Sequence, residues 1–145
     1  MVKTNPGLAH EPAVTFAAAR ADAGYTLMMI DAGGTAGPQA VYPVRHWLVV
    51  NIPGVELAKG NISGGVVGEK FHSPGPPKGS HYHRYAQFVF EQPEPTVDFS
   101  TGANANFTIP FHTDIVSWNY SIFIEQYHLG AKLASNYILC EAPGG

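Results

Sequence analysis

Short apolar runs separated by glycine and proline constrain the fold of this chain more than any other feature. Its 145 residues include 16 glycines and 12 prolines, which interrupt a sequence that is 45% hydrophobic. Because both residue types favour turns over the interior of helices and strands, they leave room only for brief regular elements. This arrangement is typical of strands joined by structured loops. We therefore expect a mostly β fold with a single hydrophobic core.

Three apolar runs predict the main strands of this fold: Tyr25–Ile30, His46–Ile52 and Tyr82–Phe90. The first run has little polar alternation, which indicates a central strand buried on both faces. Residues 13–16 predict a short first strand, and residues 134–139 predict a closing strand. In the third run, side-chain alternation places a polar set on one face: His81, His83, Tyr85 and Gln87.

Between these runs the sequence predicts loops and one helix. Ala32–Pro38 predicts a flexible loop, and residues 61–68 predict a glycine-rich connection. Phe107–Ile109 predicts a short strand or a loop packed on the core. Aromatic residues at helical spacing begin after Asn119, a suitable N-cap, and continue to Gly130, which suits the position just past a helix end.

The chain is expected to form one domain, residues 13–145, after a flexible arm, residues 1–12. Its formal net charge is -3 and its 8 basic residues are spread through the sequence, which argues against nucleic acid or an anionic membrane as a partner. The lone Cys140 excludes an intramolecular disulfide and fits a reducing compartment. No stretch has the length of a membrane span, and the start lacks the apolar run of a signal peptide. We expect a cytoplasmic protein, unless a signal peptide has been removed.

A stiff turn next to a histidine is the strongest candidate for a binding site. The segment Gly75–Gly79 reads Gly-Pro-Pro-Lys-Gly. Proline and glycine let such a loop hold a shaped rim with little conformational freedom to lose. His83 and Tyr85 follow on one face of the predicted strand, so an imidazole and a phenol would lie together beside the rim. Such a rim suits a small ligand.

These motifs together resemble the phosphatidylethanolamine-binding protein family, which includes Raf kinase inhibitor-like and carboxypeptidase Y inhibitor-like members and flowering signals. The resemblance rests first on Asp31 with its glycine-rich loop and on His46–Gly54, which reads His-Trp-Leu-Val-Val-Asn-Ile-Pro-Gly. It rests further on the turn at Gly75–Gly79 followed by His83–Tyr85, which reads His-Arg-Tyr. The segment Phe123–Ala131 also looks like the family's late helix and its Leu-Gly exit.

The resemblance implies a β-sandwich of two Greek-key sheets, with one or two short helices and a small anion pocket at one end. Such a pocket binds phosphate or phospholipid head groups, for example that of phosphatidylethanolamine, without a cofactor and without catalysis. Matched position by position, its residues would be the following: Asp31, His46, Gly75, Pro76, Pro77, His83 and Tyr85. Imidazole, phenol and backbone groups suit this role because they donate to phosphate oxygens. Asp31 would orient a histidine and favour its protonated form.

Two departures from the family pattern stand out. The family's second acid and two prolines after this strand are replaced by Ala32-Gly33-Gly34, which changes one wall of the expected pocket. Only 24 residues precede Tyr25, where relatives carry several more strands, so the sandwich is expected to be N-terminally shortened. A sheet edge left open in this way would be covered by another chain, and a homodimer is one expected solution.

Other interpretations of the same residues compete with a pocket. Asp31 could begin an Asx-turn into the glycines, and His46 could be a core histidine. Trp47 should lie in the core, on the opposite side of the strand from His46. A second hypothesis for function is inhibition of a protease or a kinase through protein contacts. A third is a metal-dependent hydrolase built on three histidines: His72, His81 and His83.

Overall fold

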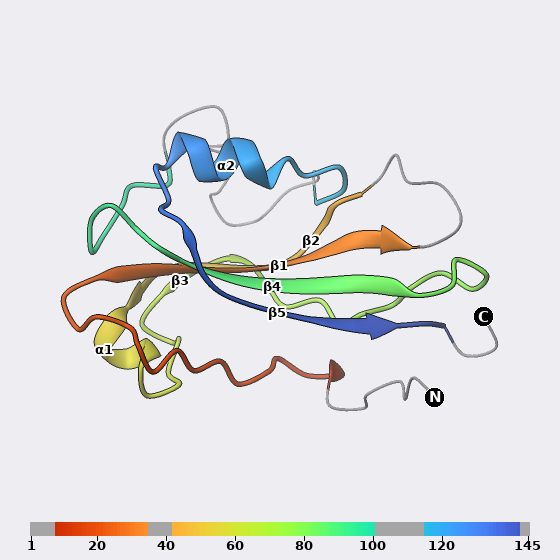
Figure 1. Ribbon diagram of the computed structural model, residues 1–145, viewed down its shortest axis with the longest axis horizontal. Coiled ribbons are helices and arrows are strands. Elements are labelled where there is room, and N and C mark those ends of the chain that lie inside the picture. Colours follow the sequence, from red (N-terminus) through yellow and green to blue (C-terminus); the bar gives the residue numbers. More distant parts are fainter. Residues whose placement is uncertain (1–7, 35–41, 101–114, 143–145) are drawn as a thin grey trace.

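The computed structural model describes residues 8–34, 42–100 and 115–142, and within them one antiparallel sheet carries two short helices (Figure 1). The strands are β1 (Gly24–Gly34), β2 (Val44–Pro53), β3 (Val66–Glu69), β4 (His83–Glu91) and β5 (Lys132–Cys140). The helices are α1 (Gly54–Leu57) and α2 (Tyr120–Gln126). The strand order is β3-β2-β1-β4-β5. The prediction of a mostly β fold with short helices is confirmed. No helix in the described ranges has the length and apolar character needed to cross a bilayer.

β1 lies at the centre of the sheet and supplies side chains to two separate apolar clusters. The first cluster contains Met28 and Ile30, and it covers one face of the sheet. The second contains Leu27 and Met29, and it covers the other face. These four side chains are at most 2% exposed. Burial of one such side chain contributes roughly 1.5–3 kcal/mol. The expectation that this run is buried on both faces is therefore confirmed.

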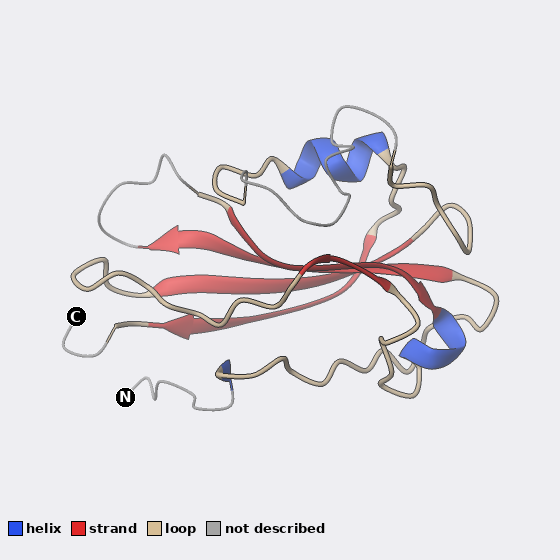
Figure 2. Cartoon of the chain, turned by 180° about the vertical axis from the view of Figure 1, so that it is seen from behind, coloured by secondary structure: helices blue, strands red, loops and turns tan. Residues whose placement is uncertain are grey.

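Helix α2 covers the first face of the sheet (Figures 1 and 2). Asn119 caps it as predicted, because its side-chain oxygen accepts a hydrogen bond from the backbone N–H of Ile122 at 3.2 Å. Phe123 enters the first cluster and is 1% exposed. The helix ends at Gln126, earlier than expected, and the backbone N–H of Gly130 donates to Glu91 instead. The aromatic spacing thus located the helix correctly and overestimated its length.

The second face is covered by irregular segments and by the short helix α1, whose Leu57 belongs to the second cluster. The predicted strand at residues 13–16 is wrong: this segment runs along the face without joining the ladder (Figure 2). Its Val14 and Phe16 pack against the second cluster, and the Phe16 N–H donates to the Leu57 carbonyl of α1 at 3.2 Å. Leu8, which falls within the expected arm, packs against the same cluster. Apolar side chains here serve as a cover and not as a strand.

Two more boundaries differ from expectation. β3 begins inside the connection expected at residues 61–68, and Gly65 just before it lies so close to β2 that a Cβ there would meet Val49 at 2.8 Å. β1 continues past Asp31 to Gly34, which pairs with His83 of β4. The glycines in both places were taken as signs of loops, although close backbone approach is what requires them. The expected element at Phe107–Ile109 lies outside the described residues.

Candidate functional site

A β-bulge in β2 determines where His46 lies. Met29 of β1 is opposite Trp47, and Ile30 is opposite Arg45, so His46 is an extra residue in the ladder. Its imidazole meets the Tyr85 ring edge-on, with centroids 5.1 Å apart. Trp47 is buried in the second cluster, to which Tyr85 also belongs. Trp47 is therefore a core residue as predicted, but the prediction that it faces away from His46 is wrong, because strict alternation does not hold through a bulge.

β1 and β4 bring the other predicted polar residues together on the second face. Asp31 is directly opposite Tyr85 in the ladder. The His83 Nδ1 lies 2.8 Å from Asp31 Oδ2, and the negative charge of the same carboxylate acts on the Tyr85 hydroxyl. The exposed fractions are 4% for Asp31, 0% for His83 and 1% for Tyr85. Asp31 of β1 thus forms one buried polar group with His83 and Tyr85 of β4, although the two strands are far apart in the sequence.

The Asx-turn interpretation of Asp31 and its contact with His83 are compatible. The Oδ1 of Asp31 accepts a hydrogen bond from the Gly33 N–H at 2.8 Å, while Oδ2 faces His83. Gly34 leaves the space that the imidazole occupies, because a Cβ at this position would lie 2.5 Å from His83 Nε2. The Ala32-Gly33-Gly34 sequence, which departs from the family pattern, therefore supports the aspartate and makes room for the histidine.

Ser80 contacts the second nitrogen of His83. The Ser80 Oγ lies 2.8 Å from His83 Nε2, and it donates to the Pro77 carbonyl at 2.6 Å. A hydroxyl has one proton, so a Ser80 that donates to Pro77 must accept from Nε2–H. Since the Asp31 carboxylate accepts from Nδ1–H, both ring nitrogens act as donors. This is the hydrogen-bond pattern of an imidazolium paired with a carboxylate.

The expected rim supplies one backbone group to this network. The Pro77 carbonyl accepts a hydrogen bond from the Ser80 hydroxyl. Pro76 is half-buried and takes part in none of the polar contacts of this network. A Cβ at Gly75 would meet nothing within 4 Å, whereas Gly79 has φ +82 and needs the freedom of glycine. The rim is thus held by turn geometry at Gly79 and by the hydrogen bond between Ser80 and the Pro77 carbonyl.

Burial shapes the chemistry of Tyr85 and His46. Burial raises the pKa of Tyr85 well above its usual range, and the negative charge of Asp31 raises it further, so the phenol remains a neutral donor. His46 Nδ1 lies 2.9 Å from the His72 carbonyl, which can only accept, so this nitrogen carries a proton. Burial lowers the pKa of His46. Its Nε2 is therefore an acceptor in the neutral ring and becomes a donor when the ring is protonated.

Several residues of the site were not anticipated from the sequence. Ser80 and Gly34 are described above, and Tyr42 packs edge-on against His83 with ring centroids 5.3 Å apart. A separate group of charged side chains lies next to His46. Arg45 Nη2 is 3.2 Å from Glu69 Oε2, and His72 Nε2 is 2.7 Å from Glu69 Oε1. Ser80 could have been suggested by its position three residues before His83. We find no local signal for the Arg45–Glu69 pair, which joins residues 24 apart.

The residues of the metal hypothesis do not form a ligand set in the described part of the chain. No group of three His, Cys, Asp or Glu side chains there is arranged to hold an ion. His81 precedes β4 at φ +58, and its Nδ1 lies 3.6 Å from Glu141. His83 is enclosed, with both ring nitrogens engaged. The expected alternation of His81 and His83 on one strand fails because the strand begins only at His83.

Comparison with known proteins identifies the family. Residues 3–137 match the family model described as phosphatidylethanolamine-binding protein. The chain therefore belongs to the phosphatidylethanolamine-binding protein family, and the resemblance seen in its motifs is confirmed. The chain is 29% identical over 140 residues to a 26 kDa secreted antigen of Toxocara canis, covering 96% of this chain and 50% of that protein. It spans half the length of this curated relative.

Two solved structures show the same fold. Carboxypeptidase Y inhibitor, in complex with its cognate proteinase, matches with a TM-score of 0.62 at 20% identity, over 84% of this chain and 61% of the inhibitor. A phosphatidylethanolamine-binding protein from Plasmodium vivax matches with a TM-score of 0.54 at 16% identity, over 83% of this chain and 64% of that protein. At these identities the likeness concerns the fold.

Proposed function

We propose that this protein binds a small anion of the phosphate type, either free or as the head group of a phospholipid such as phosphatidylethanolamine, without catalysis. The site consists of Asp31, His46, His83 and Tyr85, with the rim at residues 75–77. The observation that carries the proposal is the position of the His83 ring, whose Nδ1 contacts the Asp31 carboxylate and whose Nε2 contacts the neutral Ser80 hydroxyl.

The charges of this site favour an anion next to His83. Two donors already contact the Asp31 carboxylate: the Gly33 N–H and the His83 Nδ1–H. An oxyanion that replaced Ser80 Oγ at Nε2 would give this nitrogen a charged acceptor in place of a neutral one, which strengthens the hydrogen bond. Protonated His46, whose ring meets Tyr85, would supply a second positive donor. Ser80 would have to turn aside for the anion to bind.

The same geometry argues against a nucleophilic serine. Asp31, His83 and Ser80 are connected in the order of a Ser-His-Asp triad, in which the histidine accepts the serine proton. Here the Ser80 hydroxyl donates to the Pro77 carbonyl, and the Ser80 N–H donates to the same carbonyl at 3.1 Å. The hydroxyl is thus not activated by a base, and the N–H is not free to stabilise an oxyanion. We therefore expect that Ser80→Ala does not change the rate at which the protein hydrolyses p-nitrophenyl acetate, and that this rate does not exceed the background.

A titration of labelled protein tests the proposal. Inorganic phosphate, phosphorylethanolamine and vesicles with or without phosphatidylethanolamine are added separately near pH 6, and backbone and histidine signals are followed by NMR. Saturable shifts at Asp31, His46 and His83 to Tyr85 are expected, and they should be lost in His46→Ala but retained in His10→Ala, which changes an exposed histidine. Free phosphate and the head group are distinguished by their relative affinities. No shift at millimolar concentrations of any of the three would contradict the proposal.

Inhibition of a protease or kinase is an alternative function. It is supported by the shared fold with carboxypeptidase Y inhibitor, which was solved with its proteinase. Inhibition of a purified protease that survives His46→Ala would favour this alternative over the anion site. A homodimer remains a prediction, which sedimentation of the purified chain tests. A cytoplasmic location also remains a prediction, and one relative is described as a secreted antigen.

A further inference from the structure

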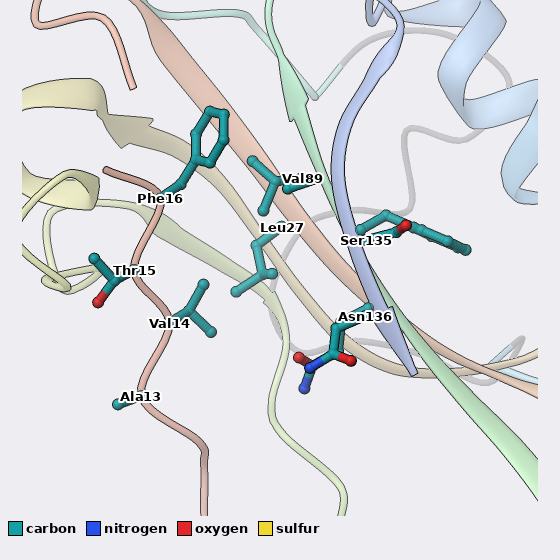
Figure 3. A pocket seen from close by; sticks show the side chains of 11 residues that line it. Ala13, Val14, Thr15, Phe16, Leu27, Val89, Ser135 and Asn136 are labelled. Atoms are coloured by element: carbon teal, nitrogen blue, oxygen red, sulfur yellow. The ribbon is translucent and has the colours of Figure 1, made fainter. Parts of the chain in front are cut away.

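A groove separates the irregular segment at residues 13–16 from the second face of the sheet. Its volume is about 190 Å³, and its walls come from the segment and from β1, β4 and β5 (Figure 3). The groove lies away from Asp31, and Gln87 in its wall is two residues along β4 from Tyr85. It shares no lining residue with the proposed anion site among the described residues.

The floor and one wall of the groove are apolar. Leu27 and Val89 project from the sheet toward the segment, and Val14 faces them (Figure 3). Leu27 is 1% and Val89 is 5% exposed. Ala134, which is opposite Val89 in the ladder, closes the β5 side with a small side chain. A short hydrocarbon group placed here would remove its own apolar surface from water by contact with these side chains.

Two carboxamides stand next to each other at the polar end of this groove. Gln87 and Asn136 are directly opposite in the β4–β5 ladder, and both line the groove. The Gln87 Nε2 donates weakly to Met29 Sδ at 3.7 Å, and within the described residues its carbonyl oxygen has no bond of its own. The Asn136 Oδ1 accepts from the Tyr137 N–H at 2.8 Å, and within the described residues its NH₂ group has no bond of its own. The pair therefore offers one acceptor and one donor to a ligand.

We propose that this groove is a second binding site, for a small uncharged molecule with a short aliphatic body and one hydroxyl or carbonyl group. The aliphatic body lies between Val14 and Leu27, and the polar group bonds to the Gln87 and Asn136 carboxamides. The described lining contains no charged side chain, so a charged ligand would lose hydration without a partner. The volume is below the range of about 300–1,000 Å³ found for drug-sized ligands, which limits the ligand to a few carbon atoms.

An NMR titration with hexan-1-ol tests this site on the intact chain. Saturable shifts are expected at the amides of Val14, Leu27, Val89 and Ala134 and at the side-chain amides of Gln87 and Asn136. Half-saturation at roughly millimolar concentration is expected for so small a ligand. Hexanoate and hexylamine, which have the same chain with a charge, should bind the groove more weakly.

Two variants make the test specific. Ala134→Phe fills the groove and should abolish the shifts, whereas Leu139→Phe adds a ring at an exposed position outside the groove and should leave them unchanged. Asn136→Leu keeps the volume but removes the donor, and it should weaken hexan-1-ol binding by about threefold to tenfold. If Ala134→Phe fails to fold, Asn136→Leu decides.

Three results would overturn the proposal. They are shifts that increase linearly without saturation, tighter binding of hexanoate or hexylamine than of hexan-1-ol in the groove, and hexan-1-ol affinity unchanged in Asn136→Leu. Shifts confined to Asp31, His46 and Tyr85 would also overturn it, because they would assign the alcohol to the anion site. Since neither phosphate nor its site takes part, failure of the anion proposal leaves this test unaffected.

Discussion

Asp31 and Glu69 are two buried carboxylates that each contact a histidine, but their surroundings differ. Asp31 pairs with His83, which is fully enclosed and is held on its other side by Ser80. Glu69 pairs with buried Arg45 and with His72, whose side chain is 48% exposed. The first network closes on a backbone carbonyl of the rim, and the second opens to water. The same residue types can therefore form an enclosed charge pair in one place and a bridge to solvent in another.

The largest effect should follow from removal of the enclosed carboxylate. Asp31→Ala leaves His83 buried without its partner and should lower the free energy of unfolding by about 3–5 kcal/mol. Urea denaturation measures the change. Asp22→Ala, which removes an exposed carboxylate paired with Arg20, is the matched control and should change stability by less than about 1 kcal/mol. Equal effects of the two substitutions would show that Asp31 and His83 are not an ion pair.

Removal of the second carboxylate should cost less. Glu69→Ala removes the carboxylate that contacts Arg45 and His72, but Arg45 still lies over the Trp118 ring at 5.0 Å and His72 reaches solvent. We expect a loss of about 2–3 kcal/mol, below the usual range for a broken buried pair. The same denaturation assay applies, with exposed Glu11→Ala as the control. A loss larger than that of Asp31→Ala would reverse the comparison between the two networks.

A pair of glycines tests how tightly the enclosed network is packed. Gly34→Ala places a methyl group 2.5 Å from His83 Nε2 and 2.7 Å from the Ser80 carbonyl. It should destabilise the protein by about 1–3 kcal/mol and shift the His83 ring signals. Gly75→Ala meets nothing within 4 Å and should change stability by no more than about 0.5 kcal/mol. If both substitutions are neutral, the close approach at Gly34 is absent in solution.

The smallest effect concerns pH and His46. Because burial lowers the pKa of His46 in the folded protein, the unfolded chain binds more protons near pH 6.5, and stability should fall as pH decreases through that value. The loss should be smaller than those above and absent in His46→Ala. Sulfate, whose charge is constant over this range, should bind more tightly at pH 5 than at pH 8 as the ring becomes a donor. Sulfate affinity that does not change with pH would exclude His46 from the anion site.

Much of the fold was predictable because its signals are local. The apolar runs at Tyr25–Ile30 and His46–Ile52 lie within β1 and β2, and the cap at Asn119 begins α2. The prediction at residues 13–16 failed because apolar alternation shows that side chains are buried but not whether the backbone has a strand to pair with. Gly34 and Gly65 were interpreted as loop residues because glycine occurs both in flexible loops and where two segments approach closely, and the sequence does not distinguish these cases.

By itself, the sequence determined the family, the main strands, the helix cap and the residue types around the turn at Gly75–Gly79, since each depends on residues close together in the chain. Only the tertiary structure decided that Asp31 faces His83, that Ser80 takes the second nitrogen, and that His46 and Trp47 share a side of the sheet. It also placed the Gln87 and Asn136 carboxamides next to each other. These outcomes depend on strand register and on a bulge, which are set by the pairing of distant segments and leave no local pattern to read.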